Sequence, residues 1–140
     1  MSTRWLRSAL ALPLALDAAG AYACGVCVED RVAVVYDHAV VERALERRHQ
    51  VAFFAVDGID RLADSGRRSL TALAESAGGV DKGSARVSLE PVSLAVAFDA
   101  QRVPLAQLRK ELTRKFTAKK VSLRFLQVLD PAAQADQVRD

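Results

Sequence analysis

The sequence predicts an α+β domain in which two helices cover one face of an antiparallel sheet. Three patterns support this prediction: a continuous apolar run at residues 51–56, period-two alternation at residues 92–98, and helical spacing of apolar side chains at residues 104–116. The composition is 51% hydrophobic and 26% charged, which suits one globular core and excludes a disordered chain. The net charge of +3 is too small to indicate a polyanionic partner.

The first strand and the first helix follow each other directly. Residues 51–56 form a fully apolar strand that ends at Asp57-Gly58, a typical turn pair. A helix is predicted from about residue 62 to residue 77, where Gly78-Gly79 ends it. Its predicted inner face consists of Leu62, Leu70, Leu73, Ala74 and Ala77.

Two strands are predicted next, at residues 85–89 and 92–98. Glu90-Pro91 separates them and can turn or bulge the chain. In the second of these strands, the larger apolar side chains fall on one face at period two. These residues are Val92, Leu94, Val96 and Phe98.

The last helix and the last strand complete the domain. Pro104 begins the helix, because proline is favoured in a first turn, and the helix runs to about Phe116. Residues 121–128 form the final strand, and the polar tail at residues 130–140 is predicted to be flexible. Residues 51–129 therefore have the order β-α-β-β-α-β, which is the order of the ferredoxin-like fold.

A helical extension precedes this domain, within residues 24–50. Apolar residues recur at helical spacing from residue 28 to residue 49, and no glycine or proline interrupts them. The β-branched run at residues 32–36 also fits a strand, although a single helix is favoured. We expect this helix to pack on the other face of the sheet or to mediate association, for example as a homodimer.

Residues 1–23 have the pattern of a secretory signal peptide. Two arginines precede an apolar run at residues 8–16, and Ala21-Tyr22-Ala23 supplies the small-x-small pattern that signal peptidase cleaves. The run is shorter than the roughly 20 residues of a membrane span. Cleavage would start the mature chain at Cys24 and place it in the periplasm or outside the cell. An uncleaved helix and a lipid anchor on Cys24 are the alternatives.

Three stretches look like parts of a known domain family. Residues 79–89 look like its turn into the second strand, residues 95–99 like its third strand, and residues 103–108 like its second helix. On these stretches, residues 51–129 resemble the heavy-metal-associated domains of copper chaperones and metal-pumping ATPases. That family carries Gly-Met-x-Cys-x-x-Cys after its first strand, where two thiolates bind a soft metal ion. Here Arg61 and Asp64 stand at the two cysteine positions. A guanidinium cannot bind a metal and a lone carboxylate is a hard donor, so the family's loop site is absent.

The candidate metal ligands are instead Cys24 and Cys27, in Cys24-Gly25-Val26-Cys27. Two thiols at this spacing can reach one soft ion, copper or zinc, and a mature N-terminus at Cys24 would add its α-amine. The alternatives are a Cys24–Cys27 disulfide in an oxidising compartment, and a redox role. Thioredoxin-like motifs follow a strand, whereas this one follows a signal peptide, so a thiol oxidoreductase is disfavoured.

His38 and His49 are not expected to complete a zinc site with Cys27. The three residues are eleven positions apart on one helical stripe, so neighbours are separated by roughly 16 Å. One metal with bonds of about 2 Å cannot span that distance. His38 is predicted to be a partly buried residue beside Asp37, and His49 a residue at the helix C-terminus.

No set of side chains indicates an enzyme. Asp57, Asp60 and Asp64 cluster after the first strand, but Asp57 fits a turn and Asp60 a helix cap, with a hard-cation site as the alternative. No Gly-rich phosphate loop or nucleophile-elbow serine is present. The basic residues within 109–120 fit a solvated helix face, with an acidic protein or an anionic lipid surface as alternative partners. Nucleic-acid binding is not expected of an exported protein.

Three hypotheses follow from the sequence, of which the exported thiol oxidoreductase is the disfavoured one. The first is an exported, periplasmic, non-enzymatic protein that binds a soft metal through Cys24 and Cys27, with no membrane span in the mature chain. The second is a protein-interaction module on a ferredoxin-like scaffold. In that module an open sheet face or the N-terminal helix contacts a partner, and the cysteines form a disulfide.

Overall fold

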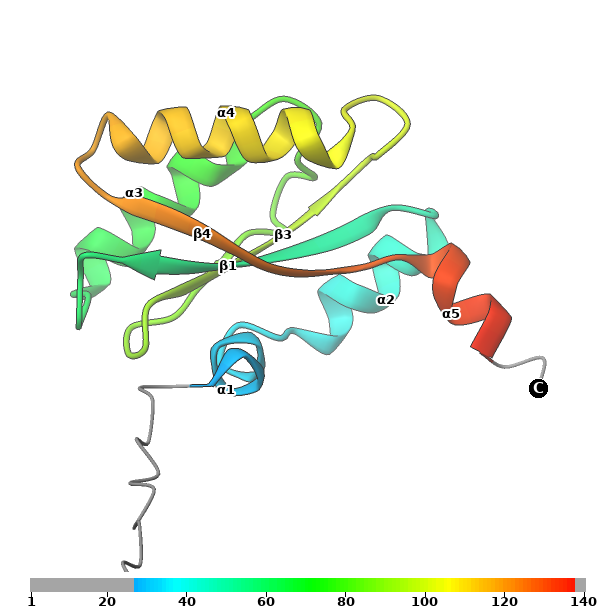
Figure 1. The fold of residues 1–140 in the computed structure, drawn as a ribbon, viewed down its shortest axis with the longest axis horizontal. Helices are drawn as coiled ribbons and strands as arrows, with labels where there is room; N and C mark the ends of the chain where they lie inside the picture. The colour runs from blue at the N-terminus through cyan, green and yellow to red at the C-terminus, as the bar shows by residue number, and fades with distance from the viewer. Residues whose placement is uncertain (1–26, 138–140) are drawn as a thin grey trace, which may run out of the picture.

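The computed structural model describes residues 27–137, and it describes side chains as far as residue 134. Four antiparallel strands form one sheet in the order β2-β3-β1-β4 (Figure 1). The strands are β1 (Gln50–Asp57), β2 (Arg86–Val87), β3 (Ser93–Phe98) and β4 (Ser122–Leu129). The helices within the domain are α3 (Asp64–Glu75) and α4 (Leu105–Thr117). The predicted α+β class and the ferredoxin-like β-α-β-β-α-β order are confirmed.

Strand β1 lies at the centre of the sheet and pairs with both β3 and β4. Residues 51–56 are all buried, because helices cover both faces of the strand. A strand that is buried on both faces shows a continuous apolar run instead of alternation. This burial explains why apolar and polar residues do not alternate along β1, although its side chains still point alternately to the two faces of the sheet.

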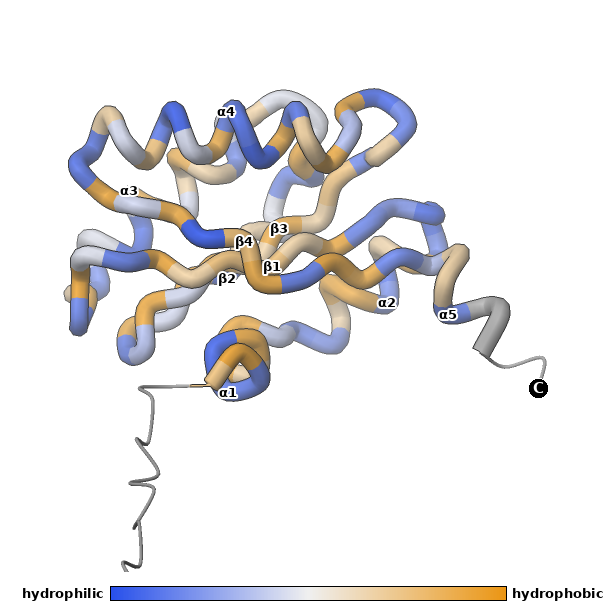
Figure 2. Tube along the Cα trace, viewed as in Figure 1, coloured by the Kyte–Doolittle hydropathy of each residue, from blue (hydrophilic) through white to orange (hydrophobic). Residues whose placement is uncertain are grey.

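The first hydrophobic core lies between the sheet and helices α3 and α4. Phe54 of β1 and Phe98 of β3 face this layer, where Leu112 and Phe116 of α4 meet them. Figure 2 shows hydrophobic and hydrophilic residues alternating along α4, as expected of a helix with one buried face. Pro104 is the residue immediately before this helix, close to the predicted start.

The second core lies on the opposite face, under the N-terminal extension. Two short helices, α1 (Val28–Ala33) and α2 (His38–Glu46), pack there (Figure 1). Their buried side chains contact the odd-numbered residues of the central strands, such as Phe53 and Ala95. Both faces of the sheet are therefore covered by helices, so the prediction of an open sheet face for docking is wrong.

The prediction of one helix over residues 28–49 is also wrong, and so is the strand alternative at residues 32–36. The chain leaves helical geometry before Asp37, whose backbone is extended (φ −115°, ψ 111°). The Asp37 carboxylate then accepts a hydrogen bond of 3.2 Å from the amide of Val40 and caps α2. This break lets both helices turn their apolar residues toward the sheet.

Asp37 also ties the extension to strand β2. The Nε of Arg86 donates a hydrogen bond of 2.8 Å to Oδ2 of Asp37. This bond, followed by the one from the Val40 amide, holds the pKa of Asp37 below its usual value. The ionised carboxylate therefore stabilises the fold above about pH 4, and this contribution is lost as the pH falls through the folded-state pKa.

We expect Asp37→Asn to make stability less sensitive to acid. Asparagine keeps the acceptor for the Val40 amide but loses the charge that pairs with Arg86. Between about pH 5 and about pH 2 the unmodified chain should therefore lose more stability than the variant. Urea unfolding at a series of pH values measures this difference, and two curves that stay parallel throughout would contradict it.

Three local boundaries differ from the predicted ones. Asp60 does not cap α3, because Ala63 occupies the N-cap position and no side chain caps it. Strand β2 is shorter than predicted, with two residues. A short helix, α5 (Pro131–Gln137), occupies the segment predicted to be a flexible tail. No helix in the described part of the chain is long and apolar enough to cross a membrane.

Candidate functional site

Cys27 lies at the N-terminus of α1, on the surface of the molecule. It occupies the N-cap position, and its carbonyl accepts a hydrogen bond of 3.1 Å from the amide of Arg31. The side chain makes no capping hydrogen bond, so the thiol remains available to a ligand. Cys24, the other predicted ligand, lies outside the described residues.

Helix α1 is held firmly against the sheet. The Nη1 of Arg31 donates a hydrogen bond of 3.1 Å to the carbonyl of Val92, just before β3. Val32 packs into the second core, and the ring of Tyr36 stacks on Phe53 with centroids 6.4 Å apart. Cys27 is therefore carried by a helix whose position the domain determines.

Charged side chains in the loop after β1 and at the start of α3 form ion pairs with their neighbours. Arg61 contacts Glu90 through Nε at 2.8 Å and a terminal nitrogen at 2.6 Å, and Asp64 contacts Arg67 at 2.8 Å. The amide of Leu62 donates to the carbonyl of Leu89, which ties this loop to the turn between β2 and β3. The two positions that carry cysteines in the heavy-metal-associated family are thus engaged in surface contacts. In residues 27–134, no group of three or more metal-ligating side chains is assembled.

His38 is exposed, so the prediction that it is partly buried is wrong. It is the first residue of α2, and its Nε2 lies 3.0 Å from Oε1 of Glu42, one turn further along. The break before Asp37 explains the difference, because it rotates His38 away from the stripe that a continuous helix would have buried.

His49 lies just after α2 and is half-buried between two carboxylates. Its Nδ1 is 2.8 Å from Oδ2 of Asp81, and its Nε2 is 3.8 Å from Oδ2 of Asp99. The spacing of these residues in the sequence does not indicate this cluster, because the turn before β2 and the end of β3 bring the aspartates to His49. In the described residues, the side chains that contact His49 are those of Asp81 and Asp99.

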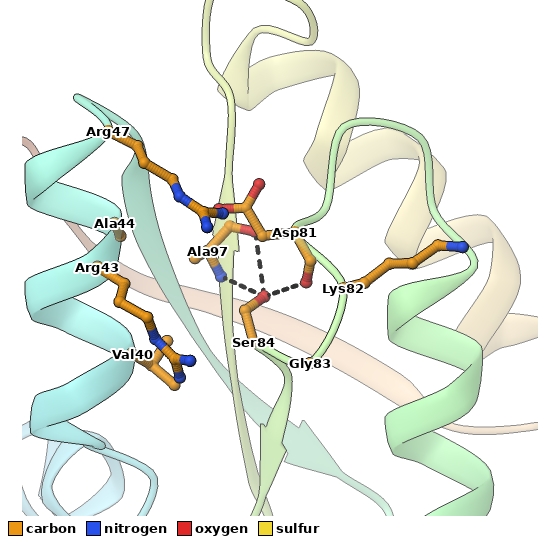
Figure 3. Close-up of a pocket in the computed structure, with 9 residues that line it drawn as sticks. All are labelled: Val40, Arg43, Ala44, Arg47, Asp81, Lys82, Gly83, Ser84 and Ala97. Atoms are coloured by element: carbon orange, nitrogen blue, oxygen red, sulfur yellow. Dashed lines mark hydrogen bonds between the residues drawn. The ribbon is translucent and has the colours of Figure 1, made fainter.

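A small hollow of about 70 Å³ lies beside this cluster, between α2 and the turn at residues 81–84 (Figure 3). Arg43 of α2 and Arg47, the residue just after α2, line it on one side, and Lys82 belongs to the turn. Ser84 is buried and holds the turn to β3, because its Oγ donates to the carbonyl of Asp81 at 2.6 Å and accepts from the amide of Ala97 at 3.2 Å. No pattern in the sequence indicates this hollow, because its walls come from segments that are distant along the chain.

Comparisons with known proteins support no function. No family model matches the chain, and no curated protein is similar to it. Among solved structures, oxidized MerP from Ralstonia metallidurans CH34 is similar at 18% sequence identity and a TM-score of 0.46. The match covers 56% of this chain and 99% of that one. At this level of similarity the match supports no conclusion about this chain beyond the topology described above.

Proposed function

We propose that this chain is an exported, non-enzymatic protein that binds one soft metal ion through the thiols of Cys24 and Cys27. The observation that carries the proposal is the position of Cys27, exposed at the N-terminus of a helix that is packed on the sheet. Cys24 is three residues earlier, so both thiols can reach one ion. Soft ions prefer thiolate ligands.

The ferredoxin-like domain would serve as the support for this ligand pair. Its own loop after β1 carries Arg61 and Asp64, and both side chains are engaged with neighbours. A metal site at that loop would need those ion pairs to break and would still lack thiolates. The N-terminal pair is therefore the better candidate.

Copper(I) suits this pair better than zinc does. Structural zinc sites use four protein ligands, and two cysteines supply only half of them. Within the described residues, no cluster of further ligands adds to Cys27. Thiolates select copper(I), and the α-amine of a chain cleaved before Cys24 would be a third donor.

A second candidate function is a protein-interaction module with a Cys24–Cys27 disulfide. It is favoured by three large apolar side chains in α1 or just after it that are exposed, Val28 at 41%, Val34 at 45% and Tyr36 at 46%. Apolar side chains that gather on a surface are typical of contact sites for other proteins. In this case the cysteines would hold the N-terminus in place without a metal.

Native mass spectrometry of the purified protein distinguishes the two candidates. We expect reduced protein to bind one copper(I) ion in competition with a chelator, and Cys27→Ser to lose this binding because one thiolate alone cannot hold the ion. Val28→Ser is the matched control, since it changes the neighbouring exposed residue and keeps both thiols.

Two other results would contradict the metal-binding proposal or favour the second candidate. Equal copper binding by Cys27→Ser and the unmodified chain would overturn the metal-binding proposal. The interaction module would be favoured by two results together. Before reduction the chain would be lighter by two hydrogens, because of the Cys24–Cys27 disulfide, and after reduction it would take up no metal.

A further inference from the structure

We propose that the hollow between α2 and the turn at residues 81–84 binds a small tetrahedral oxyanion of the phosphate or sulfate class. This site is separate from Cys27, and the proposal does not depend on metal binding. Its volume of about 70 Å³ is far below the roughly 300–1,000 Å³ of pockets that hold drug-sized ligands. The hollow therefore suits a small ion and excludes a whole nucleotide.

The lining of the hollow carries an excess of positive charge. Arg43 lies in the last turn of α2, and Arg47, four residues later, is the C-cap residue that follows the helix, so both lie on the same side. In Figure 3 both guanidinium groups extend toward the turn, while the Lys82 side chain extends away and contributes only longer-range charge. In the described part of the chain, none of these three cations forms an ion pair.

The one carboxylate in the lining does not cancel this charge. With three cations and one anion, the formal charge of the lining residues is +3 − 1 = +2. Oδ2 of that anion, Asp81, already contacts Nδ1 of His49 at 2.8 Å. An incoming oxyanion would therefore supply the negative charge that the two arginines lack.

The walls of the hollow are well ordered by internal contacts. Ser84 fastens the turn to β3 through its bonds to Asp81 and Ala97. The carbonyl of Gly83, a residue at φ +76°, accepts a hydrogen bond of 2.8 Å from Arg86. The apolar wall is formed by Val40, Ala44 and Ala97.

Arginine is well matched to this ligand class. Its planar fork donates two parallel hydrogen bonds to the oxygens of a phosphate or sulfate. Arg43 already donates its Nε to the carbonyl of Ala39 at 3.2 Å, so it offers its terminal nitrogens, and together with Arg47 it can bind an anion from one side while the turn limits the size of the anion from the other. The apolar wall strengthens these charge-assisted bonds by lowering the local dielectric constant.

A titration of the purified protein with inorganic phosphate tests the proposal. At constant ionic strength, ¹H–¹⁵N NMR spectra should show saturable shifts of the amides in the 81–84 turn. The double variant Arg43→Gln/Arg47→Gln should weaken binding by at least about tenfold, because it removes both charged donors. Both arginines are exposed, so the fold should be retained, and the dispersion of the same spectra checks this.

The matched control is Lys110→Gln/Arg114→Gln. It removes the same charge from another exposed pair four residues apart, on α4 and outside the hollow, and should leave phosphate binding unchanged. If the shifts never saturate, or if both double variants weaken binding equally, only general charge attraction remains and the proposal is overturned.

Sedimentation with vesicles of phosphatidylcholine and phosphatidylglycerol identifies the source of the anion. Vesicle binding that is lost in Arg43→Gln/Arg47→Gln but kept in Lys110→Gln/Arg114→Gln would assign a lipid headgroup to the hollow. Saturable phosphate binding without vesicle binding would assign a free anion. If neither probe binds, the hollow is not an oxyanion site.

Discussion

Replacing Phe53 by alanine should lower the free energy of unfolding by about 3–5 kcal/mol. Phe53 is 0% exposed, although it lies on the sheet face opposite α3 and α4. Its burial depends on α1 and α2, and the Tyr36 ring stacks on it. The variant removes a large apolar side chain and leaves a cavity that the packed neighbours cannot fill completely. Urea unfolding followed by circular dichroism measures the change.

Tyr36→Ala is the matched control for this prediction. Tyr36 contributes the other ring of the same stacked pair but is 46% exposed, so its truncation should cost about 1 kcal/mol. If Phe53→Ala costs no more than Tyr36→Ala, the N-terminal helices do not form a real second core in solution.

Phe98→Ala should cost a similar 3–5 kcal/mol, through the core on the other face. Phe98 is 0% exposed at the end of β3, where it packs in the layer formed with Leu112 and Phe116 of α4. Its backbone also forms a bridge with Val80, so the site is closed from the loop side as well. The same unfolding measurement applies, with Val28→Ala, at an exposed residue, as the control of small effect.

The two phenylalanine variants together test whether the extension and the domain unfold as one unit. The two cores share strands β1 and β3, so both variants should shift a single cooperative transition to lower urea. An additional early transition in Phe53→Ala alone would show instead that α1 and α2 detach before the sheet unfolds.

The central strand β1 is an element that a local sequence pattern predicts correctly. The apolar run at residues 51–56 predicts a buried strand, and β1 is buried at each of these positions. The same run requires apolar cover on both faces, which residues 28–49 supply from outside the β-α-β-β-α-β unit. Pro104 likewise marks the start of α4 to within one residue, because proline restricts the backbone locally.

The N-terminal extension shows where local patterns fail. Its apolar residues repeat at helical spacing, which predicts one helix, yet the chain breaks before Asp37. A single helix presents one straight apolar stripe, whereas the break lets both α1 and α2 bury side chains in the second core. The capping bond to Val40 and the pairing with Arg86 then stabilise the break, and Arg86 is too distant in the sequence to be anticipated.

The sequence by itself determined the order of strands and helices in residues 51–129, the absence of cysteines from the loop after β1, and the Cys24–Cys27 pair as a candidate ligand set. These features depend on residue type and short spacing, which can be read along the chain. Only the tertiary structure decided that both sheet faces are covered, that His49 lies between Asp81 and Asp99, and that Arg43 and Arg47 face the 81–84 turn. Those features depend on contacts between distant segments, which packing of the two cores brings together and which no local pattern encodes.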